Sequence, residues 1–259
     1  MNIGICVSHR EAAQVAGGYD FIEENIQRFL MPLAGEGDFA PEFVDAASCG
    51  CTIPAANSFY PGTIRTVGPD MDSATILSYA RTAFARAKLA GIRIMVFGSG
   101  GSRALPDGLS ATDAASQFAA ALSLIAPAAA VNGITIVVEP LNRAECNFIN
   151  SLAEGAAIVR SVNHPSVQLL ADIYHMMREG EGPEEIRTHA AMIRHVHIAE
   201  RETRSAPGVA GDDFLPYLRA LKESGYSGAI SLECRWTDLA GDSAIGIRTL
   251  RRQLAEAGY

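Results

Sequence analysis

Residues 133–139 read GITIVVE, a short run of mainly β-branched residues that ends at the carboxylate of Glu139. Three later stretches are built in a similar way, namely VQLLAD at 167–172, IRHVHIA at 193–199 and GAISLE at 228–233. Short apolar runs of this kind are typical of strands in a buried parallel sheet. Ala-rich stretches with helical periodicity follow such runs, which indicates repeated strand–helix units.

The same alternation extends over the whole chain. Four more strands are predicted in the first half, at 2–7, 19–24, 51–56 and 92–98. Helices are predicted near 72–90, 110–131, 150–163, 183–192, 212–224 and 241–257, with shorter ones at 9–16 and within 25–48. Eight strands in 259 residues favour a closed (β/α)8 TIM barrel over an open sheet, because such barrels have about 250 residues. No linker or low-complexity tract interrupts the pattern, so we predict a single domain over residues 1–259.

The composition limits the classes of partner. Hydrophobic residues make up 48% and charged residues 19% of the chain, as in globular proteins. The formal net charge of −8 disfavours a nucleic-acid partner, because proteins that bind nucleic acids gather Lys and Arg on one face. The two lysines, Lys88 and Lys222, fall in predicted helices, which argues against a Schiff-base lysine and a Walker-type phosphate loop.

Three features favour a cytoplasmic location. The five cysteines are scattered, so we expect free thiols in a reducing compartment. The first residues lead directly into a predicted strand, without the regions that make up a signal peptide. The longest apolar run, around 118–131, is short for a membrane span, so we expect no membrane partner.

Four predicted strands carry a potential metal ligand at or near their C-terminal ends: Glu139, Asp172, His197 and Glu233. In a barrel these ends converge on one mouth, where active sites lie. Carboxylates gathered there would repel one another, and a divalent cation removes that conflict. Three carboxylates and one imidazole suit Mn²⁺, Mg²⁺ or Co²⁺, with Zn²⁺ and Fe²⁺ as alternatives. A single strand-end carboxylate is most often a helix cap or an ion-pair partner, but four on consecutive strands favour one metal site.

Other polar residues near the predicted mouth have two interpretations each. His195 shares a strand face with His197, and we expect it to support the site rather than bind the metal. His175 is either an exposed loop residue or a substrate contact. The segment FGSGGSRALPDG at 97–108 is either a plain Gly-rich turn or an anion site completed by Arg103. Four further residues could lie either at the mouth or in the core or on the surface, namely Glu23, Glu24, Asn57 and Arg65. Trp236, three residues after Glu233, could cap the pocket or support its rim.

The second half of the chain resembles the xylose isomerase-like barrel superfamily, in particular its sugar (phosphate) isomerase/epimerase branch. That branch includes ketose 3-epimerases, hydroxypyruvate isomerases and inositol-pathway enzymes. The first half matches only as a barrel pattern. The stretches that carry the resemblance are EPLNRAE at 139–145 with Asn150–Ser151, DIYH at 172–175, HVH at 195–197, RSAPG at 204–208 and SLE at 231–233.

The resemblance implies a role for each matching residue. Glu139, Asp172, His197 and Glu233 would hold one divalent metal ion, and Glu139 and Glu233 would also face the substrate as proton-transfer groups. Further contacts to substrate oxygens would come from Glu145, His175 and Arg204, although the loop before Arg204 is about one residue longer than in the epimerases. The substrate would be a small carbohydrate, and the reaction would pass through a metal-stabilised enediolate. A homo-oligomer is compatible with this fold, and no feature of the sequence sets its stoichiometry.

Three alternative functions use the same pattern differently. A dehydratase or lyase acting on a keto-sugar or keto-inositol would form the same enediolate and then lose a hydroxyl group. An abasic-site endonuclease of this fold would need further histidines at the ends of the third and fourth strands, where the sequence has none. A non-catalytic carbohydrate-binding protein would not be expected to keep all four potential ligands.

Overall fold

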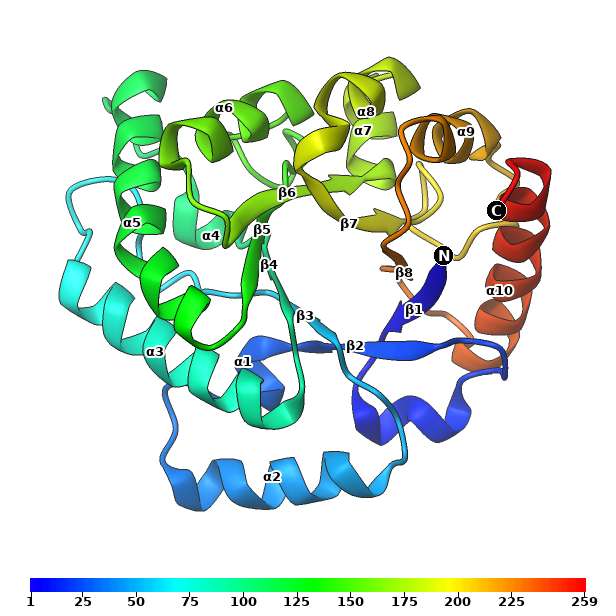
Figure 1. The fold of residues 1–259 in the computed structure, drawn as a ribbon, viewed down its shortest axis with the longest axis horizontal. Coiled ribbons are helices and arrows are strands. Elements are labelled where there is room, and N and C mark those ends of the chain that lie inside the picture. Colours follow the sequence, from blue (N-terminus) through cyan, green and yellow to red (C-terminus); the bar gives the residue numbers. More distant parts are fainter.

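Eight parallel strands close into a barrel in the computed structural model, which describes residues 1–259, and helices surround the barrel (Figure 1). The strands follow one another in chain order, and β1 closes the ring by pairing with β8 from Asn2↔Ala229 to Ile5↔Leu232. This confirms the predicted (β/α)8 TIM barrel. The strands are β1 (Asn2–Cys6), β2 (Phe21–Asn25), β3 (Ala55–Asn57), β4 (Ile94–Phe97), β5 (Thr135–Val138), β6 (Val167–Asp172), β7 (Ile193–Ile198) and β8 (Ala229–Leu232).

The helices form the outer layer. They are α1 (Ile26–Phe29), α2 (Glu36–Ser48), α3 (Ser73–Ala90), α4 (Gly100–Arg103), α5 (Ala111–Val131), α6 (Leu152–Val162), α7 (Ile173–Glu179), α8 (Pro183–His189), α9 (Leu215–Glu223) and α10 (Leu239–Glu256). Two 3₁₀ turns, η1 (His9–Gln14) and η2 (Ala190–Met192), complete the list. Polar caps start several of these helices. The side chains of Asp72, Ser110 and Ser151 accept backbone N–H groups at the starts of α3, α5 and α6, as N-cap residues do.

Four elements differ from the sequence prediction. The predicted helix at 9–16 is the 3₁₀ turn η1, and the predicted strand at 51–56 is the three-residue β3 at 55–57. Helix α7 was not predicted because Asp172 ends β6 and also caps α7, with its carboxylate 2.8 Å from the Tyr174 N–H. No turn residues therefore separate the strand from the helix. Helix α4 lies in the Gly-rich segment, where poor helix propensity concealed a single turn.

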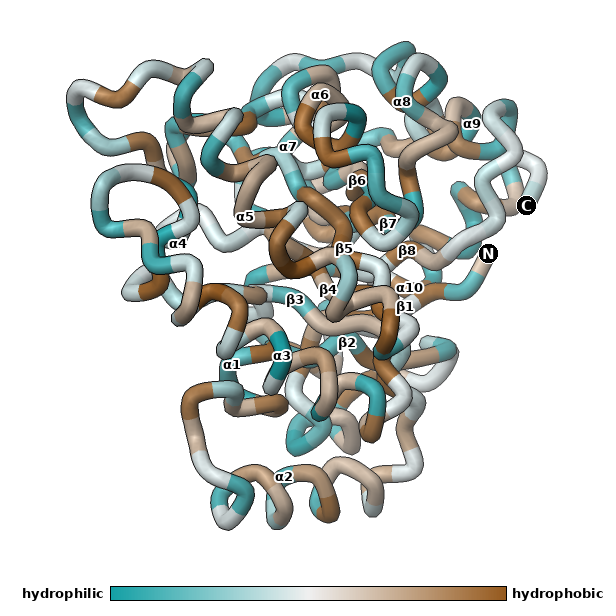
Figure 2. The backbone as a smooth tube through the Cα atoms, turned by 60° about the vertical axis from the view of Figure 1, so that its left-hand side comes forward, coloured by the Kyte–Doolittle hydropathy of each residue, from teal (hydrophilic) through white to brown (hydrophobic).

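The packing of the barrel is apolar between the strands and the helices. In Figure 2 brown, hydrophobic segments are frequent along the central strands. Helix α5 is long and apolar enough to cross a membrane by length and composition alone. In this fold it packs against α3 and α6 and buries Phe118, Leu122 and Ile125. Helix α2 lies at the periphery of the molecule in both views (Figures 1 and 2).

An acidic side chain ties the segment after α7 to the start of α6. The Glu181 carboxylate accepts the backbone N–H of Leu152 at 3.0 Å. Burial raises the pKa of Glu181 to about 7, against the opposing effect of this hydrogen bond, and the charge of Glu185 adds to the rise. The folded chain therefore keeps a proton that the unfolded chain releases near pH 4.5, so the free energy of unfolding falls between about pH 4.5 and 7.

We expect Glu181→Gln to remove this loss, because the amide keeps an acceptor oxygen for Leu152 and does not titrate. The difference in melting temperature between the variant and the wild type should be larger at pH 8 than at pH 4.5, by roughly 2–4 °C in favour of the variant. Thermal melting followed by circular dichroism at the two pH values measures this difference. A difference that does not change with pH would contradict the raised pKa.

Candidate metal centre

The four predicted ligands lie together at the C-terminal mouth of the barrel. Glu139, Asp172, His197 and Glu233 each offer one ligand atom, and these atoms all lie within 4.8 Å of one another. Asp172 and His197 are the last and the last but one residues of β6 and β7, whereas Glu139 and Glu233 immediately follow β5 and β8. Four neighbouring strands thus deliver one side chain each to the same place. The first three are buried, and the Glu233 side chain is 21% exposed.

His197 is in the middle of this cluster. Its Nδ1 lies 3.3 Å from Glu139 Oε1 and 3.7 Å from Glu233 Oε2. Burial alone would lower the pKa of His197, but the carboxylates of Glu23 and Glu233 raise it well above the ordinary value. Burial, reinforced by the charge of Glu139, raises the pKa of Glu233 to about 7, against the opposing effects of His197 and Arg204. The cluster therefore attracts positive charge.

The environment of Asp172 indicates that the positive charge is a bound cation. It is 2% exposed, and its Oδ2 is buried with no hydrogen-bond partner. An unpaired carboxylate oxygen in a protein interior is costly, and a cation bound by the cluster would satisfy it. Three carboxylates and one imidazole are a mixed O/N donor set, which suits divalent cations such as Mn²⁺, Mg²⁺ or Co²⁺. The residues present therefore fit the metal that the sequence predicts.

Arg204 links the metal cluster to Glu145, an acidic residue outside the cluster. Its Nη2 donates to Glu233, and its Nη1 lies 3.0 Å from Glu145 Oε2. The guanidinium carbon also lies 4.6 Å from the centroid of the Tyr174 ring. Arg204 adopts a left-handed backbone conformation with a φ of 53°, which is uncommon for a non-glycine residue. Arg204 thus reaches the site, next to Glu145.

His175 is not an exposed loop residue, because it lies on α7 and is 2% exposed. Its Nδ1 accepts the backbone N–H of Asn142 at 3.0 Å. Its Nε2 lies 3.6 Å from Asp172 Oδ2 and has no hydrogen-bond partner. His175 therefore borders the cluster beside Asp172, and its role in substrate binding stays a prediction.

A cavity of about 380 Å³ opens onto the cluster. Glu139 and Glu233 reach it, together with Glu145 and Arg204, whereas Asp172, His197 and His175 do not. Segments from the first half of the barrel build most of the remaining wall, which is more polar than apolar. The wall residues include Gln27, Ser58, Tyr60, Pro61, Gly62 and Gly98–Gly101. Of these, the sequence analysis singled out only the Gly-rich segment, because isolated serines, glycines and glutamines carry no distinctive pattern.

The anion site proposed around Arg103 is wrong as far as Arg103 is concerned. This side chain is fully buried and donates to the carbonyl oxygens of Phe97 and Glu139 at 3.0 and 2.6 Å. It therefore fixes the backbone at the ends of β4 and β5 and offers no charge to a ligand. Arg65 is likewise bound to backbone carbonyl oxygens, those of Gly101 and Ala104. Arg204 is thus the cation of the cavity wall.

A family model described as "Xylose isomerase-like TIM barrel" matches residues 10–255 of the chain. The chain belongs to this family. The match covers both halves of the barrel, including the first half, in which the sequence showed only the barrel pattern.

Individual relatives within this family match shorter stretches. The chain is 36% identical over 115 residues to an L-ribulose 3-epimerase of Methylomonas sp. (strain DH-1), a match that covers 44% of this chain and 40% of the relative. It is 31% identical over 126 residues to a putative hydroxypyruvate isomerase of Drosophila melanogaster, covering 47% and 48%. The matched stretches thus span less than half the length of these relatives. A solved D-allulose 3-epimerase from Methylomonas sp. has the same fold, with a TM-score of 0.82, 22% identity and 98% of both chains covered.

Gly98 gives a test of the cluster in which none of the predicted ligands is itself substituted. A Cβ atom at this position would overlap the Glu139 carboxylate, so Gly98→Ala should push Glu139 out of the cluster. We expect the affinity for Mn²⁺, measured by isothermal titration calorimetry, to fall about tenfold or more.

The matched control is Gly101→Ala, in the same segment. Its Cβ would meet only the backbone of Gly62, at 3.2 Å, so we expect wild-type affinity for Mn²⁺. Equal affinities in the two variants would show that Glu139 does not need its place beside Gly98 to bind a metal ion.

Proposed function

We propose that this protein is a metal-dependent isomerase or epimerase of a sugar or sugar phosphate, which works by proton transfer next to a carbonyl group. One observation carries the proposal. Of the four clustered side chains, Glu139 and Glu233 also line the cavity. These two carboxylates therefore meet a bound substrate, whereas Asp172 and His197 lie behind them.

The metal ion would be held by Glu139, Asp172, His197 and Glu233. A divalent cation in that position supplies positive charge that stabilises an enediolate. The identity of the relatives supports this chemistry, because 3-epimerases and hydroxypyruvate isomerases both move a proton on a carbon next to a carbonyl group. The mixed carboxylate and imidazole donor set supports the metal.

Glu139 and Glu233 would move the proton. One carboxylate removes it from the carbon next to the carbonyl, and the electron pair of that C–H bond passes into the enediolate. A glutamate then returns a proton. Return to the same carbon from the opposite face gives an epimer, and return to the adjacent carbon gives an aldose–ketose isomer. Both carboxylates are available from the cavity, as epimerisation requires, whereas isomerisation needs only one of them.

Glu145, His175 and Arg204 would orient the substrate. Arg204 and Glu145 line the cavity and are paired at 3.0 Å, so their hydrogen-bonding groups are held in fixed positions. His175 does not line the cavity, so it would contact only a substrate group that reaches past the cavity lining to Asp172, through its Nε2. A fixed arrangement of this kind lowers the cost of placing the reacting carbon against the proton-transfer groups.

The decisive experiment incubates the Mn²⁺-loaded protein with ketoses, ketose phosphates and hydroxypyruvate in deuterated water. We expect deuterium to enter the carbon next to the carbonyl of one substrate, with an epimer or isomer as the product. Glu139→Gln and Glu233→Gln should each lower this exchange by about 10²–10⁴-fold, because each variant lacks a proton-transfer group. Nuclear magnetic resonance of the products locates the label.

Asp172→Asn separates loss of the metal from loss of the base. Asp172 belongs to the cluster but does not reach the cavity, so saturating Mn²⁺ should restore part of its exchange but not that of Glu139→Gln. Equal rescue of both variants would remove Glu139 from the proton-transfer step. Release of water from the substrate would instead identify a dehydratase or lyase, and wild-type exchange without any divalent metal would refute the metal-dependent mechanism.

Glu145→Gln tests the substrate-binding role. The amide keeps the shape of the side chain but weakens its bond to Arg204, so Arg204 loses its fixed position. We expect KM to rise about tenfold, the cost of one hydrogen bond to a charged group, with unchanged Mn²⁺ affinity. Steady-state kinetics and calorimetry measure the two quantities, and an unchanged KM would exclude Glu145 from substrate binding.

A further inference from the structure

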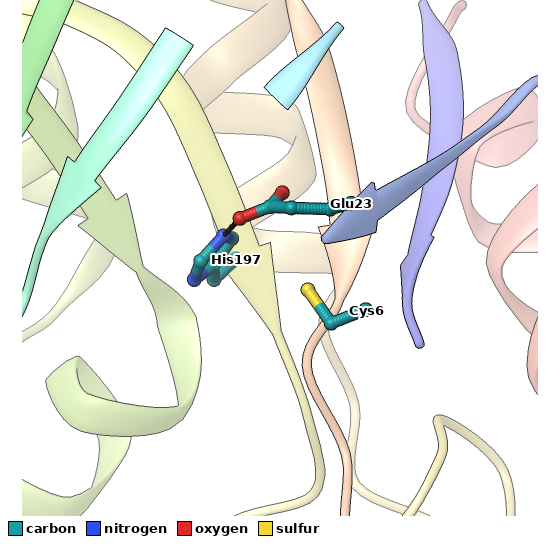
Figure 3. Close-up of side chains that lie close together, drawn as sticks. All are labelled: Cys6, Glu23 and His197. Atoms are coloured by element: carbon teal, nitrogen blue, oxygen red, sulfur yellow. Dashed lines mark hydrogen bonds and ion pairs between the residues drawn. The ribbon is translucent and has the colours of Figure 1, made fainter. Parts of the chain in front are cut away.

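Beneath the metal centre, inside the barrel, one carboxylate joins two histidines. Glu23 on β2 reaches across the barrel interior to β7, as Figure 3 shows for its contact with His197. Its Oε1 lies 2.9 Å from His197 Nε2, and its Oε2 lies 2.7 Å from His195 Nε2. All three side chains are 1% exposed or less. Each oxygen of Glu23 therefore accepts one imidazole N–H.

This contact decides which ring nitrogen of His197 faces the metal cluster. His197 Nε2 is bound to Glu23, whereas Nδ1 faces Glu139 and Glu233 at 3.3 and 3.7 Å. A ring nitrogen that donates a proton to a carboxylate cannot bind a metal ion, so the lone pair is left on the other nitrogen.

We propose that Glu23 is a positioning residue that fixes the ring and the tautomer of His197, so that Nδ1 is presented to the metal. The proposal rests on the metal centre of the proposed function. His195 is the second anchor: its Nε2 binds the other oxygen of Glu23 and lies 3.3 Å from Ser231 Oγ. The carboxylate is thereby held at both ends, and rotation of the His197 ring would break its bond to Glu23.

Cys6 offers a competing interpretation of the same cluster. Ligand atoms of Cys6, Glu23 and His197 also lie within 4.8 Å of one another, and Figure 3 shows the thiol beside the other two side chains. A metal ion bound there through His197 Nε2 would break the bond of that nitrogen to Glu23. The observed pairing of Glu23 with both histidines therefore favours positioning over a second metal site.

The next residue supplies a matched control. Glu24 points to the opposite side of β2 and is 2% exposed, and its Oε1 lies 2.7 Å from His9 Nδ1. Glu23 and Glu24 are thus neighbouring buried carboxylates that each bind an imidazole at the same distance. Only Glu23 contacts a member of the metal cluster, so a general cost of losing a buried carboxylate would appear in both variants.

The test compares the Mn²⁺ affinities of the metal-free wild type, Glu23→Gln, Glu24→Gln and Cys6→Ser by isothermal titration calorimetry, with melting temperatures to confirm folding. We expect Glu23→Gln to bind about 10–100 times more weakly, and Glu24→Gln and Cys6→Ser to match the wild type. Equal affinities of Glu23→Gln and the wild type would overturn the proposal. So would a stoichiometry that falls from two Mn²⁺ ions to one in Cys6→Ser.

A second measurement needs no variant. In the Mg²⁺-saturated wild type, ¹⁵N resonance of the histidine rings should show that His197 Nε2 keeps its proton and Nδ1 has none. A proton on Nδ1 and none on Nε2 would overturn the proposal even if Glu23→Gln failed to fold. Neither experiment depends on turnover, so failure of the isomerase activity would leave the outcome interpretable.

Discussion

Mutual repulsion of carboxylates at the barrel mouth is the constraint on which the rest of the site depends. Glu139, Asp172 and Glu233 lie within reach of one ion, and like charges this close in a buried site disfavour ionisation. His197 in the middle of the cluster and Arg204 at its edge reduce this repulsion. The pKa of Glu233 is nevertheless raised to about 7 by burial and by Glu139. The cluster thus contains more negative charge than its own cations offset, which is the property a divalent metal site needs.

The same constraint explains the unusual interior of the barrel. Interiors of such barrels are commonly filled with apolar layers, and Val96, Val137 and Leu170 form such a group here. Between β2 and β7 the interior is polar instead, because Glu23 forms hydrogen bonds with His195 and His197. Burial raises the pKa of Glu23, but the two histidines more than offset this, so the carboxyl stays ionised. A buried charge of this kind is tolerated because it is bound at both oxygens.

The four clustered side chains, which form the floor of the site, were predicted from the sequence to lie together, whereas most of the cavity wall was not predicted. The reason is physical. Each floor residue, such as Glu139 or Asp172, stands at the end of an apolar strand, where it breaks a visible pattern and where barrel topology alone brings the ends together. Wall residues such as Ser58 and Gln27 break no pattern. Glu23 was left undecided because its partner lies far along the chain, and only strand register places it opposite His197. The role of Arg103 was left open because its exposure, not its position in the chain, decides whether its charge is available.

The two halves of the barrel therefore contribute different things. Strands β5–β8 supply the four clustered side chains, whereas the loops after β2, β3 and β4 supply most of the cavity wall. Some first-half residues help to position the clustered side chains. Asn57 donates a hydrogen bond to Glu233 at 3.2 Å, and Gly98 leaves space for Glu139. A change of wall residues would alter which molecule fits without moving a ligand of the cluster. Because the clustered side chains and most of the wall come from different halves of the chain, the second half of the sequence alone indicates the chemistry of the site.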